Sequence, residues 1–239
     1  MITLELPPIT TWHEPILKPD ESRITKALNM AELDQLTGWI SLGEPIVLPI
    51  TSKLVPEDDM ALRQFLELND ASYKFFLIQL ACTFKPPQDE WFKQAWMAVN
   101  LVREDNSPES QPIAWDMQPK LVAQPVEISS TVKLNASLKL AEIFLGAQAG
   151  VEQEKKWTES QIFLEALNEL QSDPVWEFSR TVTAQIRGLH RFHLVVRAPR
   201  GAVTSGTVNL SATVERKRFL FITYQTNFSD APQLTFRLP

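Results

Sequence analysis

The feature that most constrains this chain is an alternation of side chains over residues 126–140. One parity of this run is apolar at seven of its eight positions, and the other parity carries only polar or charged side chains. Because successive side chains of a strand point to opposite faces of a sheet, the run predicts a strand with one buried and one solvated face. A straight strand over this run would span roughly 50 Å, well above the common length of about 17–20 Å. We therefore expect the run to bend, to pass from one sheet to another, or to form one arm of a long hairpin.

Strand-length segments with apolar or alternating side chains recur along the rest of the chain. They cover residues 73–84, 91–102, 176–186, 192–196, 203–216, 219–224 and 234–238. Strands with one apolar face are typical of antiparallel sheets, whereas a parallel α/β core would show continuous apolar runs between regular helices. We expect a mainly β fold (all-β with minor α), namely an antiparallel β-sandwich-like body with a short mixed α/β N-terminal segment and one inserted helix.

The N-terminal part of the chain has a different pattern, because prolines punctuate it and two stretches have helical spacing. The first stretch predicts a helix at about residues 23–36 that ends at Gly38. The apolar segment 45–50 contains prolines and is expected to be an edge strand, where proline is tolerated. Pro56 and the three acidic residues after it suit the electropositive first turn of a second helix.

One helix is predicted inside the β-rich part. Residues 158–161 (Thr-Glu-Ser-Gln) have the spacing of a capping box, and apolar residues follow at helical spacing until residues 172–174 (Ser-Asp-Pro) end them. This pattern predicts a helix at about residues 159–171, inserted between strands. The chain then divides into a mixed helical, proline-punctuated segment, residues 1–72, and an antiparallel β-rich body, residues 73–239; one continuous domain is the alternative.

The cysteine content and the first residues bear on the compartment. The single cysteine, Cys82, excludes an internal disulfide, and its apolar neighbours favour a buried thiol that packs as a small hydrophobic side chain. Residues 1–8 lack the basic stretch and apolar core of a secretory signal. No window approaches the roughly 20 apolar residues of a membrane-spanning helix. We therefore expect a cytoplasmic, bacterial protein.

The sequence contains no recognised motif that indicates a particular reaction or cofactor. His190 and His193 are three residues apart, so on a strand they would face opposite sides and could not share one ion. The chain has no Gly-x-Ser-x-Gly elbow and no glycine loop with the lysine that cradles a phosphate. The carboxylates that could still converge for acid–base chemistry are Asp116, Glu152, Glu154 and Glu177. We assign no catalytic residue, no metal ligand and no cofactor.

Charge is distributed unevenly along the chain. Residues 180–239 hold nine basic and two acidic residues, a net charge of +7, whereas residues 1–179 carry a net charge of −13. Such asymmetry indicates either an anionic partner for the basic segment or an internal contact between the two segments. Eight of the nine basic residues are arginine, which binds carboxylate and phosphate groups bidentately. The basic residues at strand ends are expected to form the contact surface: Arg197, Arg200, Arg216, Lys217 and Arg218.

These patterns favour a non-catalytic β-rich interaction or scaffold module that binds another protein through an arginine-rich C-terminal surface. An anionic surface or lipid is an alternative partner, whereas nucleic acid is not expected because the whole chain is acidic, with a pI of about 5.2. A second hypothesis is a membrane-associating or pore-forming β protein, since residues 126–140 and 203–216 have the pattern of inserting hairpins. A third is an enzyme of unrecognised type. The sequence does not indicate strand order or oligomeric state.

Overall fold

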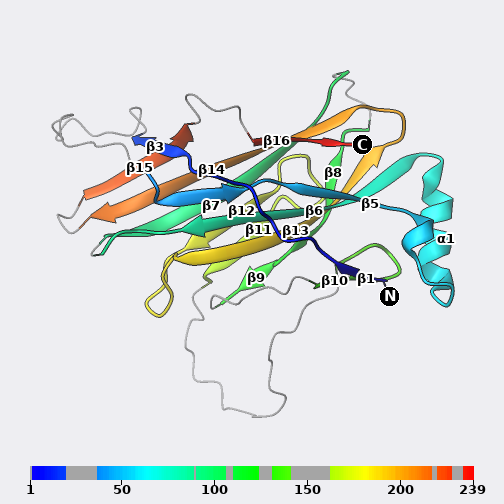
Figure 1. Cartoon of the computed structure of the whole chain (residues 1–239), viewed down its shortest axis with the longest axis horizontal. Coiled ribbons are helices and arrows are strands. Elements are labelled where there is room, and N and C mark those ends of the chain that lie inside the picture. Colours follow the sequence, from blue (N-terminus) through cyan, green and yellow to red (C-terminus); the bar gives the residue numbers. More distant parts are fainter. Residues whose placement is uncertain are drawn as a thin grey trace, which may run out of the picture.

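Every strand pairing in the described part of the computed structural model is antiparallel, and the strands form three sheets. The structure describes residues 2–19, 37–88, 90–105, 110–123, 131–140, 162–216, 220–227 and 234–239, with backbone alone for residues 2, 17–19, 131, 216 and 220–227. The two larger sheets pack face to face (Figure 1), so the expected antiparallel, sandwich-like fold is confirmed.

The six-stranded sheet is built around two long, buried strands, β6 and β13, which pair along their full length. Its strands, in spatial order, are β2 (Trp12–His13), β4 (Ile40–Gly43), β6 (Tyr73–Phe84), β13 (Gly188–Pro199) and β8 (Ile113–Gln118), with β5 (Ile46–Ile50) beside β6. The predicted edge strand at 45–50 is confirmed as β5, which carries Pro49 and pairs with β6.

The eight-stranded sheet contains the two longest described strands, β7 and β14, which pair with each other. Its strands, in spatial order, are β3 (Ile16–Pro19), β15 (Leu220–Asn227), β14 (Thr204–Arg216), β7 (Glu90–Arg103), β12 (Val175–Ser179), β11 (Leu164–Leu167) and β9 (Leu121–Val122), with β16 (Leu234–Leu238) beside β14. A small third sheet pairs β1 (Ile2–Glu5) with β10 (Thr131–Leu134). Each of the three sheets thus combines strands from residues 1–72 with strands from residues 73–239.

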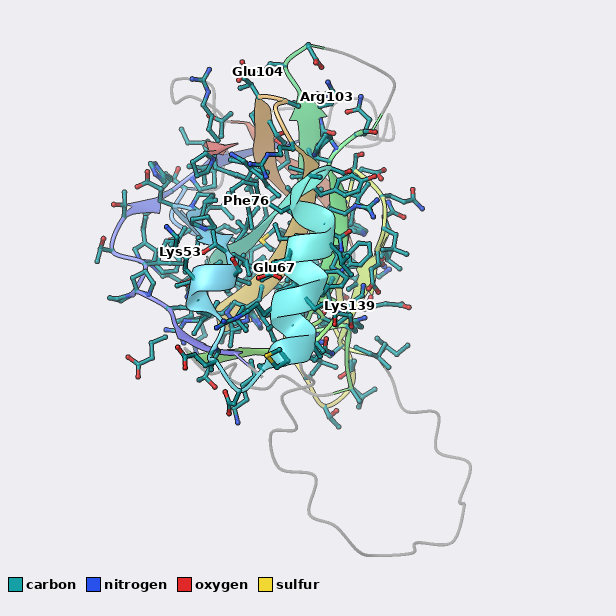
Figure 2. All side chains as sticks on the ribbon, turned by 90° about the vertical axis from the view of Figure 1, so that its right-hand side faces the viewer. Lys53, Glu67, Phe76, Arg103, Glu104 and Lys139 are labelled. Atoms are coloured by element: carbon teal, nitrogen blue, oxygen red, sulfur yellow. The ribbon has the colours of Figure 1, made fainter. Side chains whose placement is uncertain are left out.

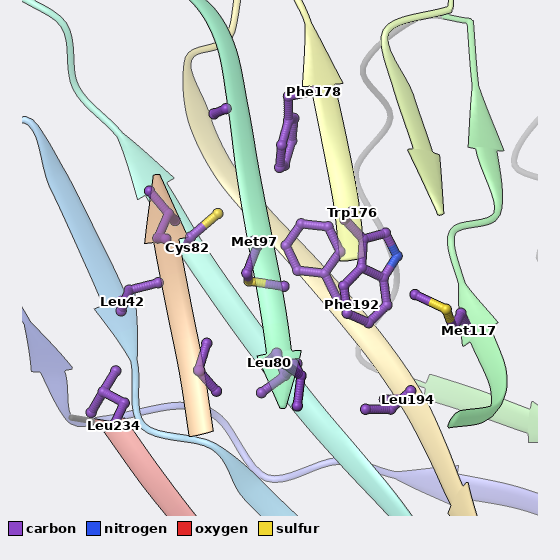
Figure 3. Close-up of a cluster of buried hydrophobic side chains, with 14 of the residues drawn as sticks. Leu42, Leu80, Cys82, Met97, Met117, Trp176, Phe178, Phe192, Leu194 and Leu234 are labelled. Atoms are coloured by element: carbon purple, nitrogen blue, oxygen red, sulfur yellow. The ribbon is translucent and has the colours of Figure 1, made fainter. Parts of the chain in front are cut away.

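The main core lies between the two large sheets and is formed by the apolar side chains on the inward faces of their strands (Figure 3). On β14 the inward positions Val208, Leu210, Ala212 and Val214 are all buried, as their alternation predicts. Trp176 and Phe192 meet across the sheets with ring centroids 4.9 Å apart. Such aromatic pairs add about 0.5–1.5 kcal/mol beyond the burial of their area. Cys82 is fully buried in this core, as expected.

A second apolar cluster lies on the outward face of the six-stranded sheet, where α1 (Met60–Asp70) and the β1–β10 pair cover it. Leu62 and Leu66 of α1 contribute to it together with Leu77 of β6 and Val195 of β13. The central strands of this sheet are therefore buried on both faces. This explains why residues 73–84 read as one continuous apolar run rather than as an alternation.

The second predicted helix is confirmed and is preceded by the short 3-10 helix η3 (Ser52–Leu54). It begins at Met60, four residues after Pro56, because Asp59 caps it and accepts a hydrogen bond from the Leu62 amide at 3.2 Å. The predicted helix at 23–36 lies outside the described residues. None of the helices in the described segments is long and apolar enough to cross a membrane.

The alternating run at 126–140 bends at Asn135, one of the alternatives left open by its length. β10 ends at Leu134, and Leu140 returns to form an antiparallel bridge with Leu134. The Asn135 Oδ1 atom accepts the backbone amides of Ser137 and Lys139, each at 3.0 Å, and so closes the turn. Val132 and Leu134 before the turn and Leu138 and Leu140 after it are buried, whereas Ala136 in the turn is exposed. Residues 126–130 lie outside the described residues.

The inserted helix expected at 159–171 is wrong over its described part. Residues 164–167 form strand β11, which pairs with β12 and β9. The chain then leaves any helical path, because Asn168 and Leu170 adopt left-handed φ angles of 62° and 66°. The edge of β12 offers a full ladder of backbone hydrogen bonds here, and this tertiary pairing outweighs the local helical spacing. Residues 159–161 lie outside the described residues.

Candidate functional site

The described members of the five basic residues predicted to form one surface are not brought together. Arg197 and Arg200 lie where β13 ends and β14 is about to begin, close to α1; we call this the helix end. Arg216 closes β14 at the opposite end of the sandwich, twelve residues beyond Thr204. At about 3.3 Å per residue this is a separation of roughly 40 Å. Lys217 and Arg218 lie outside the described residues.

Arg197 and Arg200 are held by internal contacts at the helix end. The Arg197 guanidinium carbon lies 4.4 Å from the centroid of the Tyr73 ring and 4.8 Å from that of Trp115, so it is packed between two aromatic faces. Arg200 donates to the Asp70 carbonyl oxygen, and its Nη1 atom lies 2.6 Å from the Asp70 carboxylate. Arg200 therefore holds α1 against the end of β13. Arg197 packs between an aromatic side chain of β6 and one of β8.

A hollow of about 340 Å³ opens beside these residues at the helix end, between α1 and the first residues of β6. Its apolar wall includes Leu66 and Phe75, and its cations are Arg200 and Lys74. Lys74 Nζ is 3.3 Å from the Pro239 carbonyl oxygen. Figure 2 looks onto this end and shows α1 in front, with cationic and acidic side chains intermixed around it. The charges of the helix end are thus largely balanced.

The opposite end carries a second, more open hollow whose charged side chains are both cations. Lys85 follows the last residue of β6, and Arg187 precedes the first residue of β13; because β6 and β13 are antiparallel, the two come together. Gly188 begins β13 with a φ of 88°, a left-handed conformation that favours glycine. The hollow is lined by Thr83, Phe84, Lys85, Pro86, Gln88, Arg187 and Gly188.

The two cations of this hollow have weak internal partners. Arg187 Nη2 donates to the Pro86 carbonyl at 3.4 Å. Lys85 Nζ is 3.4 Å from the Ser41 hydroxyl and 4.0 Å from the nearest Glu14 oxygen, the outer limit of an ion pair. Both side chains belong to exposed residues. They keep most of their charge available to another molecule.

A fixed cluster of three side chains borders the same end on the eight-stranded sheet. The Glu215 carboxylate accepts a hydrogen bond from Trp91 Nε1 at 2.8 Å and one from Arg180 Nη1 at 3.1 Å. The Arg180 guanidinium also lies 4.4 Å from the centroid of the Trp91 ring. Glu215 therefore neutralises Arg180.

The end of β6, the start of β13 and the end of β14 therefore gather Lys85, Arg187 and Arg216; we call this the basic end. Arg216 pairs in register with Glu90, and only five residues of chain separate Glu90 from the last residue of β6. The contact residues expected from the sequence did not include Lys85 or Arg187, and two of them, Arg197 and Arg200, lie at the helix end. The available signal was their position in the sequence: Lys85 follows one long strand and Arg187 precedes another, and antiparallel pairing of the two strands would make them neighbours.

The candidate carboxylates do not converge. Asp116 is fully buried on the outward face of the six-stranded sheet, whereas Glu177 lies on the outward face of the eight-stranded sheet, beside Gln94 at 3.5 Å. The sandwich separates them. Glu152 and Glu154 lie outside the described residues.

Asp116 belongs to a cluster of polar and charged side chains that links β8 to the segments that contain Leu140 and Glu169. It accepts the Leu140 amide, and its Oδ1 atom lies 3.0 Å from Lys120 Nζ. Glu169 lies 3.1 Å from both Lys120 and Lys139. Burial raises the pKa of Asp116, and the hydrogen bonds from Lys120 and Leu140 offset this only in part. Burial alone would lower the pKa of Lys120, but its hydrogen bonds to Asp116 and Glu169 raise it.

The two histidines lie on opposite faces of β13, as their spacing predicts. His190 packs among the rings of Phe84, Phe163 and Phe178, with centroids 5.0–5.9 Å away. His193 is fully buried on the other face. Burial lowers the pKa of each histidine to about 4. Over the described residues, no group of three or more His, Cys, Asp or Glu side chains is placed to hold a metal ion.

The fold and these contacts define an antiparallel β-sandwich that exposes Lys85 and Arg187 at one end, where their partners among the described residues are weak. No model of a known protein family matches the chain, and no curated protein matches its sequence.

Proposed function

We propose that the protein is a non-catalytic interaction module that binds an acidic surface of another protein through its basic end. The observation that carries the proposal is the meeting of Lys85 and Arg187 in one open hollow, where their partners among the described residues are weak. Arg216 ends β14 at the same end, and Lys217 and Arg218 follow it in the sequence. The proposed contact surface thus keeps Arg216, Lys217 and Arg218, adds Lys85 and Arg187, and gives up Arg197 and Arg200.

The chemistry of this end favours carboxylates as the groups bound. Guanidinium groups bind carboxylates in bidentate geometry, and clustered cations speed the encounter with an oppositely charged partner. The net charge of −6 for the whole chain opposes binding to extended polyanions such as nucleic acid or an anionic membrane.

The first experiment compares two double variants with equal loss of charge. Lys85→Ala/Arg187→Ala removes two cations from the basic end, and Lys53→Ala/Arg237→Ala removes two from the helix end, where Arg237 is 77% exposed. Partners are captured with the unaltered protein, identified by mass spectrometry, purified and titrated against each variant. We expect the basic-end variant to weaken the dissociation constant roughly tenfold, with a steep salt dependence, and the helix-end variant to leave it unchanged.

Equal effects of the two variants, or binding that does not respond to salt, would refute the assignment. A third variant, Arg216→Ala/Lys217→Ala/Arg218→Ala, tests the other half of the basic end and is expected to weaken binding without unfolding the protein. Circular dichroism of each variant establishes that loss of binding is not loss of fold.

Two observations weigh against the other hypotheses. The apolar side of β14 and that of residues 132–140 are already packed in the two cores, so insertion into a bilayer would require the sheets to come apart. We expect no dye release from anionic liposomes. Of the candidate carboxylates, Asp116 and Glu177 lie on opposite sides of the sandwich, so these two share no site; Glu152 and Glu154 lie outside the described residues. A cytoplasmic location remains part of the proposal, supported by the free, buried thiol of Cys82.

A further inference from the structure

Three strands of the six-stranded sheet place polar side chains in one row on its outward face. His193 of β13 lies opposite Gln79 of β6 on one side and opposite Gln118 of β8 on the other. Directly opposed residues of antiparallel strands have Cβ atoms about 4.5–5.5 Å apart. The neighbouring residues of β13, Phe192 and Leu194, point into the main core instead. The row therefore lies between the sheet and the layer that covers it.

Gln79 and His193 of the row are buried, Gln118 is half-buried with its Nε2 atom shielded from solvent, and four polar atoms of the row lack partners among the described residues. Gln79 is 2% exposed and His193 is 0% exposed. Within the described part of the chain, no group hydrogen-bonds to Gln79 Oε1, to Gln118 Nε2 or to either ring nitrogen of His193. A buried polar atom without a partner keeps its full desolvation penalty. Four such atoms together would remove a large part of the net stability of a domain, so the native protein must satisfy them.

The four atoms have matching chemistry along the row. Gln118 Nε2 is a donor, and Gln79 Oε1 is an acceptor. A neutral imidazole between them offers one acceptor nitrogen and one N–H donor. Hydrogen bonds can therefore run in one direction, from Gln118 through His193 to Gln79. The three side chains are not in direct hydrogen-bonding geometry, so each gap needs a molecule that both accepts and donates.

We propose that this row is an internal hydration site, in which one water on each side of His193 completes a relay from Gln118 to Gln79. Water fits because it accepts from one neighbour and donates to the next, and buried waters typically satisfy groups of this kind. A carboxylate fits less well, since it cannot donate onward to the acceptor nitrogen of His193 or to Gln79. The relay fixes one imidazole tautomer, with the N–H toward Gln79, and joins β6, β13 and β8 beneath their cover.

The test is water–protein magnetisation transfer in the full-length, isotope-labelled protein. We expect long-lived water cross-peaks to the His193 ring protons and to the Gln118 side-chain amide, and a single neutral tautomer in the long-range nitrogen–proton spectrum of His193. Gln79→Met should remove the water on the β6 side and leave the one on the β8 side, and Gln118→Met should do the reverse.

A control variant on the opposite sheet, Gln94→Met, should leave both waters in place. Absence of water cross-peaks at His193, or cross-peaks there from a side chain of the protein, would overturn the proposal. If a methionine variant fails to fold, a high-resolution crystal structure of the unaltered protein decides the same question, because electron density between His193 and each glutamine either shows a water or does not.

Discussion

Phe236 lies with its ring directly over the α-carbon of Gly206, its partner across the β14–β16 pair. A Cβ atom on Gly206 would lie 2.7 Å from the Cε1 and Cε2 atoms of Phe236 and still closer to its Cζ atom. The backbone of Gly206 is ordinary strand, so the glycine is needed for space alone. This contact lets the last strand, β16, close over the core near the helix end.

Gly206→Ala is therefore expected to destabilise the protein by about 2 kcal/mol, because the ring must leave its place in a close-packed core. Urea denaturation measures the loss. The double variant Gly206→Ala/Phe236→Leu should recover part of it, since the smaller side chain vacates the contested space. Ser205→Ala, on the other face of the same strand, is the matched control and should change stability little. A Gly206→Ala protein as stable as the unaltered one would contradict the contact.

Stability should fall as the pH is lowered from about 6.5 to about 4. Burial lowers the pKa of His193 to about 4, whereas an unfolded histidine titrates near 6.5. Between these values the unfolded state binds a proton that the folded state does not, so acid favours unfolding. The fully buried His193 alone accounts for about 3 kcal/mol over this range. Urea denaturation at several pH values checks this, and His193→Gln should flatten the dependence; an unchanged slope would count against the burial of the neutral ring.

Asp116→Ala should cost about 3 kcal/mol, because it leaves the buried amide of Leu140 without its acceptor and Lys120 without its nearest carboxylate. Asp116→Asn is the sharper comparison, since it keeps an acceptor for Leu140 while removing the charge. We expect it to cost about 1 kcal/mol, because Lys120 is 45% exposed and keeps Glu169. Thermal or urea unfolding separates the two; equal losses would mean that the charge matters more than the amide.

Arg197→Met should lower stability by about 1 kcal/mol and leave partner binding unchanged. The methionine keeps much of the apolar stem but loses the cation that lies over Tyr73 and Trp115. Urea denaturation gives the first value, and titration with the captured partner gives the second. A variant that is as stable as the unaltered protein but binds the partner poorly would show that Arg197 belongs to the contact surface.

The strands and their apolar faces could be predicted from the sequence because each depends on local alternation. β6, β14 and β16 were found within one or two residues of their ends. The helix predicted at 159–171 failed because pairing of β11 with β12, which local spacing does not encode, decides that segment. The grouping of arginines failed for a related reason: Arg200 and Arg216 are close in sequence, yet β14 holds them at opposite ends of the molecule. Lys85 and Arg187 are a hundred residues apart in sequence and meet only through the antiparallel register of β6 and β13.

The pairing of β3 with β15 has a consequence for how this protein is made. Residues 16–19 pair with residues 224–227, and β1 pairs with residues 131–134. The first strands synthesised therefore leave the ribosome long before their partners exist. Such long-range pairing makes folding slow and leaves strand edges exposed in the meantime. During translation the early strands therefore stay unpaired, and the eight-stranded sheet can close only once nearly the whole chain has emerged.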